Sequence, residues 1–430
     1  MLKKNILLIT TDQQSATMMS CTGNQDLNTP HLDQLARDGV RFEKAYAAQP
    51  LCIPQRNCWY TGMMPSELGI TYNHLGIPNE STTWMGKIFQ EAGYATGISG
   101  KWHVNLPVEE SGFEWISNIR ENGADEHIVP DFQRFLADKE DRPFLFSASF
   151  NNPHNICEAA RGGYLADGNP GTFENINQLP ELPKNFEIPT GEPDALREVQ
   201  KIYSRVYPTQ NWDETRWRIH RWMYARMNEM IDQKVGELIT ILRENGLYDD
   251  TLIVYSSDHG DGDGHHKWNQ KQSLYDESAR IPFIISQPGS NLNQVNTTQL
   301  VNNGIDLIPT LCGLANIEAP KCLQGKDWSQ VLTNTTLAPQ REYLIAETEF
   351  CGWEVTSDIK ARMVRSQQFK YIIFNQGEPR ESLIDMDADP GEMNNLINSV
   401  DHAVIIQQHR DYLKDYLQKS ADNFGLELIP

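Results

Sequence analysis

The chain has 430 residues, a formal net charge of −21, and an ordinary balance of 39% hydrophobic and 22% charged residues. This length suits one large domain with a smaller companion, and the composition is that of a globular protein. The acidic excess argues against a general nucleic-acid binder and against a protein that lies on an anionic membrane, so an anionic substrate would need a local group of cations.

The N-terminal stretch MLKKNILLITTD places two lysines before an apolar run, as a signal peptide does. The run from Ile6 to Ile9 is only four residues long, however, and no small-residue cleavage site follows. No run approaches the roughly 18 apolar residues of a membrane span. Seven cysteines, at positions 21, 52, 58, 157, 312, 322 and 351, are odd in number and scattered, unlike a disulfide framework or a paired zinc ribbon. We expect a cytoplasmic protein with reduced thiols, or a periplasmic protein if a leader has been removed.

Four stretches share one layout, in which an apolar run of strand length is followed by polar residues. In chain order they are NILLITTD, ending at Asp12; YATGISGKWH, ending at Lys101 and His103; PFLFSASFNNPH, ending at His154; and TLIVYSSDHG, ending at Asp258 and His259. Helical patterns such as NTPHLDQLARDGV and YARMNEMIDQKVGELITILRENG lie between them. This alternation predicts an α/β fold with a large mixed, mostly parallel sheet sandwiched by helices. The polar clusters should then meet beyond the carboxyl ends of the strands.

Two further regions have a different character. Residues 155–215 are rich in Pro and Gly with poor periodicity, and they could form a wall of the substrate pocket or a mobile surface excursion. From about residue 340, the stretches REYLIAETE, ARMVRSQQFKYIIFN and ESLIDMDADPGEMNNLIN predict short antiparallel strands, and a final helix follows Asp401. We therefore predict a large domain over 1–338 and a smaller C-terminal α+β domain with an antiparallel sheet over 339–430.

Asp12, Asp258 and His259 are candidate metal ligands at strand ends. Two carboxylates and an imidazole suit a divalent cation, and the oxygen-rich set favours Ca²⁺, Mg²⁺ or Mn²⁺ over zinc. The alternative, for each residue taken singly, is that the aspartates are helix caps or turn formers and the histidine is a hydrogen-bonded loop residue.

A second set of residues is cationic or can become so, and it could form a local anion pocket: Arg56, Lys101, His103, His154, His266 and Lys271. Guanidinium and ammonium groups stabilise the charge of a tetrahedral oxyanion in a transition state. His154 follows a proline, which holds its backbone, and it could act as a general acid. For each of these residues alone, a solvated lysine or a hydrogen-bonded loop histidine is the alternative.

Cys52 opens the stretch CIPQRNCWYTG. A free cysteine is most often a small buried hydrophobe. A nucleophilic thiolate would need a basic neighbour, and Arg56, one helical turn further on, could serve. Cys58 is too far along the chain for a CxxC redox pair. The residues alone thus indicate a cysteine near an anion site with a metal, and they leave its role open.

Cys52-Ile-Pro54-Gln-Arg56, followed by Thr61-Gly62, resembles the signature of the type I, formylglycine-dependent sulfatases of the alkaline phosphatase superfamily. The resemblance continues in order over about 400 residues, through NILLITTDQQ, NTPHLDQLARDGVRFEKAYAAQPLC, GKWH, NNPH, SSDHGDGDGHHKWNQKQSLYDESARIPFII and FKYIIFN…SLIDMDADPGEMNNL. Several ordered matches make it specific, whereas the cysteine motif alone would be weak. It implies an alkaline-phosphatase-like fold.

The resemblance also implies that a maturation enzyme oxidises Cys52 to Cα-formylglycine, which hydrates to a geminal diol. One diol oxygen would attack sulfur in line, expel the substrate alcohol and form a covalent sulfate hemiester. The second hydroxyl would then lose its proton, sulfate would leave, and the aldehyde would re-form. Pro54 and Arg56 would be part of the tag for modification. Gln55 stands where Ser or Ala is common, which leaves the core pattern intact.

Carried over by position, the ligands of the divalent cation would be Asp12, Gln13, the modified Cys52, Asp258 and His259. Ca²⁺ is the first choice of ion, with Mg²⁺ and Mn²⁺ as alternatives. Gln13 stands where many relatives have a second Asp, and His259 where others have Asn, so the resemblance leaves open whether Gln13 binds through its amide oxygen.

The resemblance assigns roles to the cationic set in the same way. Arg56 would hold the diol, and Lys101 and Lys271 would hold the sulfate oxygens. His103 would be the base that collapses the diol, and His154 the acid that protonates the leaving group. His266 would be a substrate contact.

The resemblance thus predicts a sulfuric-ester hydrolase, and we expect its substrate to be a sulfated saccharide, a small one if the enzyme is cytoplasmic. The reasons are the acidic chain and the aromatic- and Asn-rich stretches CWYTG, TYNHLG and 155–215. Alternatives are a phosphonate monoester hydrolase or phosphodiesterase of the same superfamily, a choline- or arylsulfatase, and a non-catalytic carbohydrate-binding relative. The expected partners are the sulfated small molecule or oligosaccharide and the formylglycine-generating maturation enzyme, with no nucleic acid and no membrane.

Overall fold

The four apolar stretches that end in polar residues are neighbouring strands of one sheet. The computed structural model describes the chain except for residues 1–2, 74–75, 77, 79–81, 334–338 and 351–356. The strands β4 (Ala95–Lys101), β6 (Phe144–Pro153), β1 (Asn5–Asp12) and β7 (Thr251–Ser257) lie side by side in this order, and all run parallel. Their carboxyl ends therefore meet at one edge of the sheet, as the sequence predicts.

Four more strands extend this sheet to the order β5-β4-β6-β1-β7-β8-β2-β9. β5 (Trp115–Arg120) pairs with β4 in parallel, and β8 (Phe283–Ser286) runs antiparallel to both β7 and β2 (Gly39–Phe42). β9 (Gln294–Asn296) pairs with β2 in parallel. The sheet is thus mixed but mostly parallel, which confirms the predicted fold class.

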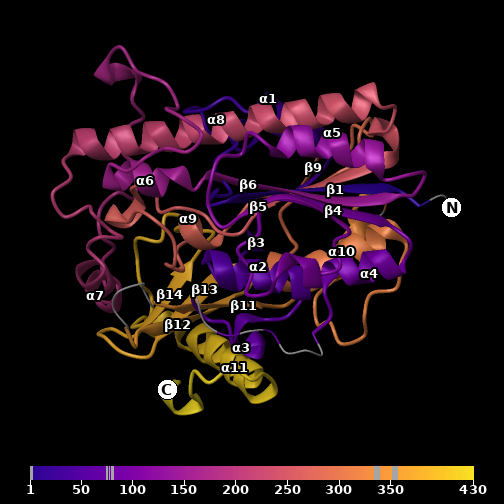
Figure 1. Ribbon diagram of the computed structural model, residues 1–430. Coiled ribbons are helices and arrows are strands. Elements are labelled where there is room, and N and C mark those ends of the chain that lie inside the picture. The colour runs from indigo at the N-terminus through magenta and orange to yellow at the C-terminus, as the bar shows by residue number, and fades with distance from the viewer. Residues whose placement is uncertain (1–2, 74–75, 77, 79–81, 334–338, 351–356) are drawn as a thin grey trace.

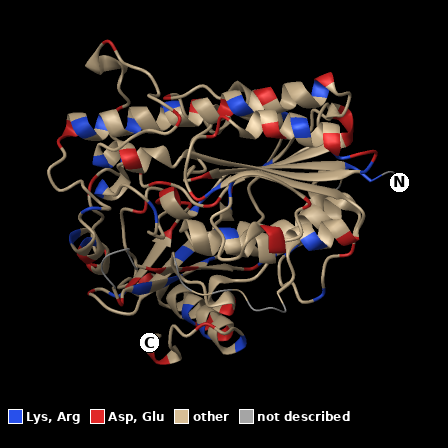
Figure 2. Cartoon of the chain, in the orientation of Figure 1, with Lys and Arg blue, Asp and Glu red and all other residues tan. Residues whose placement is uncertain are grey.

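Helices cover both faces of the sheet (Figure 1). One face carries α1 (Pro30–Arg37), α5 (Ile128–Asp138) and α8 (Glu214–Glu244), and the other carries α2 (Cys52–Thr61), α4 (Met85–Glu91) and α10 (Asn303–Ala315). Alternate side chains of β1 enter the two cores: Ile6 and Leu8 pack on the α2 side, whereas Leu7 and Ile9 pack on the α8 side. Figure 2 shows charged residues on these helices, while the strands carry few over most of their length.

The C-terminal part has a sheet of its own. β11 (Leu344–Glu349), β12 (Lys360–Arg365), β13 (Phe369–Phe374) and β14 (Glu381–Asp385) form a four-stranded antiparallel sheet, and α11 (Ala403–Lys419) follows it. This confirms the predicted antiparallel sheet and final helix. The predicted boundary between 338 and 339 adjoins residues outside the described part, and it stays a prediction.

Shorter elements complete the described chain. β3 (Ala45–Tyr46) and β10 (Val301–Asn302) form a two-stranded parallel pair, and α3 (Pro65–Leu68) and α9 (Asp276–Ala279) are single turns. Residues 155–215 contain α6 (Asn155–Arg161) and α7 (Ala195–Ile202) among irregular segments. Of the helices described, none has the length and apolar character needed to cross a membrane. Cys351 lies outside the described residues, and the other six cysteines are free thiols.

Candidate active site

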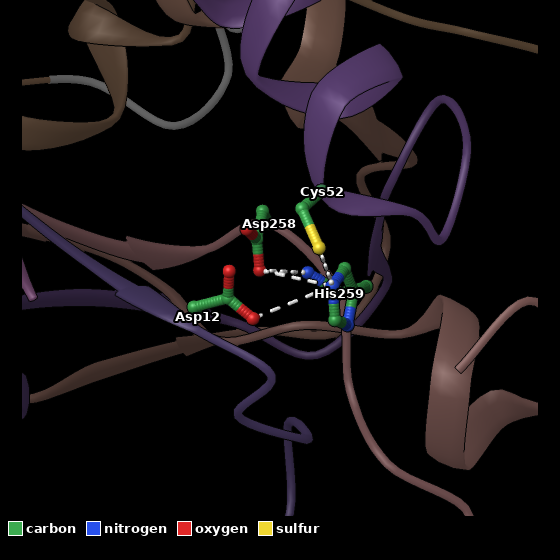
Figure 3. Close-up of side chains that lie close together, drawn as sticks. All are labelled: Asp12, Cys52, Asp258 and His259. Carbon is green, nitrogen blue, oxygen red and sulfur yellow. Dashed lines mark hydrogen bonds and ion pairs between the residues drawn. The ribbon is translucent and has the colours of Figure 1, made fainter. Parts of the chain in front are cut away.

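Four side chains converge where the central strands end (Figure 3). Asp12 is the last residue of β1, Asp258 and His259 follow β7, and Cys52 is the first residue of α2. One ligand atom from each of the four lies within 4.8 Å of those of the other three, and all four side chains are buried. The topology thus brings together residues that are up to about 250 positions apart in the sequence.

The start of α2 is fixed by Gln55. Its Oε1 atom accepts hydrogen bonds from the backbone N–H groups of Ala48, at 2.8 Å, and Gln49, at 3.2 Å, while its Nε2 atom donates to Asn303 Oδ1 at 2.7 Å. The helix ends at Gly62, whose φ of 71° suits the left-handed closing position. Gln55 therefore holds the segment that leads to Cys52, a role that its position in the motif did not reveal.

Three cations pair with the three acidic members of the group. Lys101 Nζ lies 2.6 Å from Asp12 Oδ2, Arg56 Nε lies 2.8 Å from Asp258 Oδ2, and Lys271 Nζ donates to Cys52 Sγ at 2.9 Å. Burial disfavours the Asp12 carboxylate, but nearby positive charge, above all that of Lys101 and Lys271, outweighs burial and holds the pKa of Asp12 well below its usual range.

The Cys52 thiol is poised as a thiolate in this unmodified chain. Burial and the charge of Asp12 oppose ionisation, yet Lys271 and hydrogen bonds from His103 and His154 lower the pKa of Cys52 well below its ordinary value. Its place in the first turn of α2 also favours a negative charge there. The arrangement therefore stabilises an anion at the side chain of residue 52.

His259 presents one ring nitrogen to the group. Its Nδ1 atom lies 3.0 Å from the carbonyl oxygen of Gly260, which can only accept, so Nδ1 carries the proton. Nε2 then offers a lone pair 3.5 Å from Asp258 Oδ1 and 3.6 Å from Asp12 Oδ1. A backbone carbonyl that fixes the tautomer in this way is typical of metal-binding histidines. Burial and the nearby Asp12 charge raise the pKa of Asp258 to about 6.

The donor set fits a divalent cation. Among the described residues, Asp12 Oδ1 and the Nη2 atom of Arg56 have no hydrogen-bond partner although both atoms are buried, whereas Asp12 Oδ2 is engaged by the ammonium group of Lys101 at 2.6 Å. Buried polar atoms are nearly always satisfied, so the unpaired Asp12 Oδ1 atom, 3.6 Å from His259 Nε2, indicates a missing ligand. Two carboxylates and one imidazole match the ligands that hard or borderline divalent ions take.

Two histidines, His103 and His154, hydrogen-bond the side chain of Cys52. Burial lowers the pKa of His103, and burial together with Lys101 and Lys271 lowers the pKa of His154 to about 3. Both rings are therefore neutral at neutral pH in this state. His103 has a φ of 51°, in the left-handed region that non-glycine residues rarely adopt, and such backbone conformations cluster at functional sites.

Several polar residues that the motifs did not single out hold these groups in place. Lys101 Nζ donates to Asn122 Oδ1 at 2.8 Å and to Asn151 Oδ1 at 3.2 Å. Arg56 Nη1 donates to Ser149 Oγ at 2.9 Å and to the carbonyl oxygen of Lys101 at 3.0 Å. Asn151 opens the NNPH stretch, so the sequence did contain a signal for it, whereas Ser149 lies inside a strand and gave none.

Gln13 and His266 are placed differently from the other predicted site residues. Gln13 Oε1 accepts from Cys157 Sγ at 3.1 Å and Nε2 donates to Asp261 Oδ2 at 2.7 Å, so its amide oxygen could bind a metal only by giving up or sharing that contact. His266 is fully buried, stacks on Tyr275 at 3.9 Å between ring centroids, and has its Nε2 atom 2.8 Å from the carbonyl oxygen of Gly391. This geometry does not bring His266 to Cys52, and it gives His266 a structural environment.

The aromatic residues of CWYTG also differ from expectation. Trp59 and Tyr60 are at most 1% exposed, and Tyr60 packs against Trp102 with ring centroids 4.5 Å apart. α2 is buried on all sides, so these rings belong to the core and offer no face to a saccharide. The part of the substrate argument that rested on CWYTG is therefore wrong.

Comparison with known families agrees with the site. The sulfatase family model matches residues 4–317, which includes every element that supplies the Cys52 group. This chain belongs to the sulfatase family. A second model, described as the C-terminal part of N-sulphoglucosamine sulphohydrolase, matches residues 264–419 of this sulfatase.

Individual relatives cover almost the whole chain. The sulfatase is 29% identical over 446 residues to a Δ4,5-hexuronate-2-O-sulfatase of Bacteroides thetaiotaomicron, covering 98% of this chain and 90% of the relative. A solved structure titled as a 2-O GAG sulfatase matches with a TM-score of 0.87 at 28% identity, covering 98% and 94% of the two chains. The phosphonate monoester hydrolase of Agrobacterium radiobacter matches with a TM-score of 0.78, covering 97% and 95%, but at 20% identity it shows the shared fold alone.

Proposed function

We propose that this sulfatase removes an O-sulfate group from a sulfated saccharide, with formylglycine formed from Cys52 as nucleophile and a divalent cation, Ca²⁺ first, held by Asp12, Asp258 and His259. The observation that carries the proposal is that two kinds of side chain surround Cys52, metal-ligand atoms and hydrogen-bonding groups. The Cys52 side chain lies among metal-type ligand atoms from Asp12, Asp258 and His259, as Figure 3 shows. It is also hydrogen-bonded to Lys271, His103 and His154.

The cations of the site provide the binding of the sulfate group. When bound, the divalent ion would stabilise the negative charge that develops on the reacting oxygens. Lys101 and Lys271, which here neutralise Asp12 and Cys52, would turn to the sulfate oxygens once those two groups have another partner. Arg56 stays fixed by Asp258 and Ser149, and it would support the diol.

The two histidines would act in different proton transfers, His103 as a base and His154 as an acid. His103 is neutral, because burial lowers its pKa, and a neutral imidazole can take the proton of the second diol hydroxyl. His154 is also neutral here, because burial and the charges of Lys101 and Lys271 lower its pKa to about 3. A sulfate placed between the same two lysines would oppose their effect and favour the proton that the leaving alcohol needs.

The saccharide class rests on the relatives. The chain matches, over 98% of its length, a curated protein named as a hexuronate-2-O-sulfatase and a structure titled as a GAG sulfatase. With a net charge of −21, the protein as a whole repels sulfated ligands, so binding has to come from the local cations around Cys52. We include the maturation enzyme that oxidises Cys52 as the required partner.

A panel of defined sulfated mono- and disaccharides tests this proposal, with protein co-expressed with a maturation enzyme. We expect turnover of at least one member and, by mass spectrometry of the peptide that contains Cys52, an aldehyde in place of the thiol. An aryl sulfate and an aryl phosphodiester of the same alcohol are the matched pair: faster phosphodiester cleavage would make the protein a phosphodiesterase. An unmodified Cys52 with no turnover of any ester would favour a carbohydrate-binding relative.

A further inference from the structure

Residues 151–155, which we name the 151–155 turn, rest on two acidic residues from other loops. Asp125 Oδ1 accepts the backbone N–H of Asn151 at 2.6 Å, and Asp125 Oδ2 accepts that of Asn152 at 2.8 Å. Asp167 Oδ2 accepts the side-chain Nδ2 groups of Asn155, at 2.9 Å, and Asn152, at 3.2 Å. Asp167 Oδ1 in turn accepts the backbone N–H of Asp125 at 2.6 Å, so the two carboxylates form one support.

The 151–155 turn carries two groups that face the Cys52 site. Asn151 Oδ1 accepts from Lys101 Nζ at 3.2 Å, and the side chain of His154 hydrogen-bonds Cys52. The backbone N–H of His154 donates to the carbonyl oxygen of Asn151 at 3.0 Å, so the two groups move together. A shift of this turn would displace a sulfate-binding lysine and the proposed acid at once.

The two carboxylates do not serve the helices beside them. Asp125 lies just before α5, whose N-cap position is His127 and which has no side-chain cap, and both oxygens of Asp125 accept from the 151–155 turn. Burial and the negative charge of Asp167 also raise the pKa of Asp125, so keeping both acids here costs free energy. The bonds to the turn are the interactions that offset this cost.

We propose that Asp125 and Asp167 are positioning residues, which hold the 151–155 turn and thereby fix the amide on Lys101 and the imidazole beside the nucleophile. As a statement about catalysis, this inference rests on the proposed function. Among the described residues, neither acid contacts a predicted site residue directly with its side chain. Both act through the 151–155 turn, so neither is a catalytic residue.

Asp125→Asn is the direct test. An amide can accept only one of the two N–H groups and places a donor against the other, so the turn should loosen. We expect kcat on the best sulfate ester to fall by about 10- to 100-fold with KM changed by less than about threefold, since a displacement of about 1 Å can cost that much in rate. Asp167→Asn should lower kcat in the same direction by less, and it decides the question if Asp125→Asn does not fold.

Asp232→Asn is the matched control. Asp232 in α8 is also buried, and its Oδ1 and Oδ2 atoms accept the successive backbone N–H groups of Leu32, at 2.8 Å, and His31, at 3.3 Å. Burial raises its pKa as well, yet its partners belong to α1 and not to the Cys52 site. Its substitution should lower the melting temperature to a similar extent and leave kcat per folded molecule unchanged.

Hydrogen exchange provides a measurement that does not depend on turnover. Asp125→Asn should raise exchange in residues 150–156 but not in 29–34, and Asp232→Asn should do the reverse. If wild-type protein cleaves no sulfate ester, the proposed function fails while this measurement still reports on the turn. Unchanged exchange in 150–156, a kcat of Asp125→Asn within about twofold of wild type, or an equal loss in Asp232→Asn would each overturn the inference.

Discussion

Two buried groups of charges differ in how completely they are satisfied. The first is the Cys52 cluster: Asp12, Cys52, Asp258 and His259, with Arg56, Lys101 and Lys271. The second is the Lys370 cluster: Lys370, Asp276, Glu392 and Arg280, which joins the C-terminal sheet to α9. In the Lys370 cluster, Lys370 Nζ lies 2.5 Å from Asp276 Oδ1, 2.8 Å from Glu392 Oε1 and 3.2 Å from the carbonyl oxygen of Leu274.

Every polar side-chain atom of the Lys370 cluster that is buried has a hydrogen-bond partner within the described chain, including Arg280 Nε on Asp276 Oδ2 at 2.8 Å. In the Cys52 cluster, Asp12 Oδ1 and the Nη2 atom of Arg56 lack one among the same residues. A satisfied cluster holds two parts of a protein together, whereas an unsatisfied one is kept ready for a ligand. Four variants test whether the two clusters differ in this way.

Cys52→Ala should have the largest effect. If Cys52 is the precursor of the nucleophile, as proposed, turnover of any sulfate ester should fall by about 10⁴-fold or more. Cys58→Ala is the matched control, because it removes a buried thiol from the same helix; it should lower stability and leave kcat unchanged. Steady-state kinetics on both variants decide this, and comparable losses would mean that α2 supports the site only as a scaffold.

Lys370→Met should come next, and it should act on stability alone. It leaves the buried Glu392 without its cation, while Asp276 keeps Arg280, so we expect the free energy of unfolding to fall by about 3 kcal/mol. Lys360→Met, in the neighbouring strand, breaks a partly exposed pair with Glu349 at 3.3 Å and should cost less than about 1 kcal/mol. Denaturant titrations measure both values. A loss of kcat per folded molecule in Lys370→Met would show that the Lys370 cluster is not purely structural.

Ca²⁺ should stabilise the protein through the Cys52 cluster only. At about 100 times its dissociation constant, a bound ion raises the free energy of unfolding by about 2.7 kcal/mol. Asp258→Asn should remove this increment, and Lys370→Met should keep it on a lower baseline. Thermal unfolding with Ca²⁺ and with a chelator gives the increments. An increment that survives in Asp258→Asn would place the ion elsewhere.

Glu392→Gln should have the smallest effect, visible as a change in pH dependence. Burial and the charges of Asp276 and Glu277 raise the pKa of Glu392 to about 7, against the pull of Lys370. Between the ordinary value of 4.5 and about 7, the folded chain therefore binds more protons than the unfolded chain, so this group makes stability fall as the pH rises. The variant should lack this contribution, which is at most about 1.4 kcal/mol per pH unit.

Unfolding at pH 5, 6, 7 and 8 tests this last prediction. Glu427→Gln, an exposed residue near the C-terminus, is the control and should follow the wild-type curve. If the Glu392→Gln curve has the wild-type slope, then the Lys370 cluster keeps Glu392 ionised as completely as water does.

The sequence predicts most of the fold because its strongest signals are local. The four central strands are uniform apolar runs, each closed by polar residues, and their parallel order brings Asp12, Lys101 and Asp258 to one edge. The strands β2, β8 and β9 were not predicted from periodicity, since each has only three or four residues. Runs this short have no measurable periodicity, and their place in the sheet is decided by tertiary contacts.

The sequence predicts some residues of the candidate site and misses or misplaces others. His266 sits between motif residues, and nothing in GHHKW tells it apart from them. In the structure its φ of 55° marks a sharp local turn, and the ring packs on Tyr275. Trp59 and Tyr60 were misjudged because α2 is buried all round, so its sequence has no polar face to contrast with an apolar one. Asp125 and Asp167 gave no signal, because their role depends on a turn from another part of the chain.

The burial of α2 also sets an order of events. Cys52 is 1% exposed, all ten residues of its helix are buried, and Gln55 ties the approach to the body of the protein. If Cys52 is modified as we propose, an enzyme that has to reach its side chain has no access once this helix has docked. The modification would then have to precede the docking of α2.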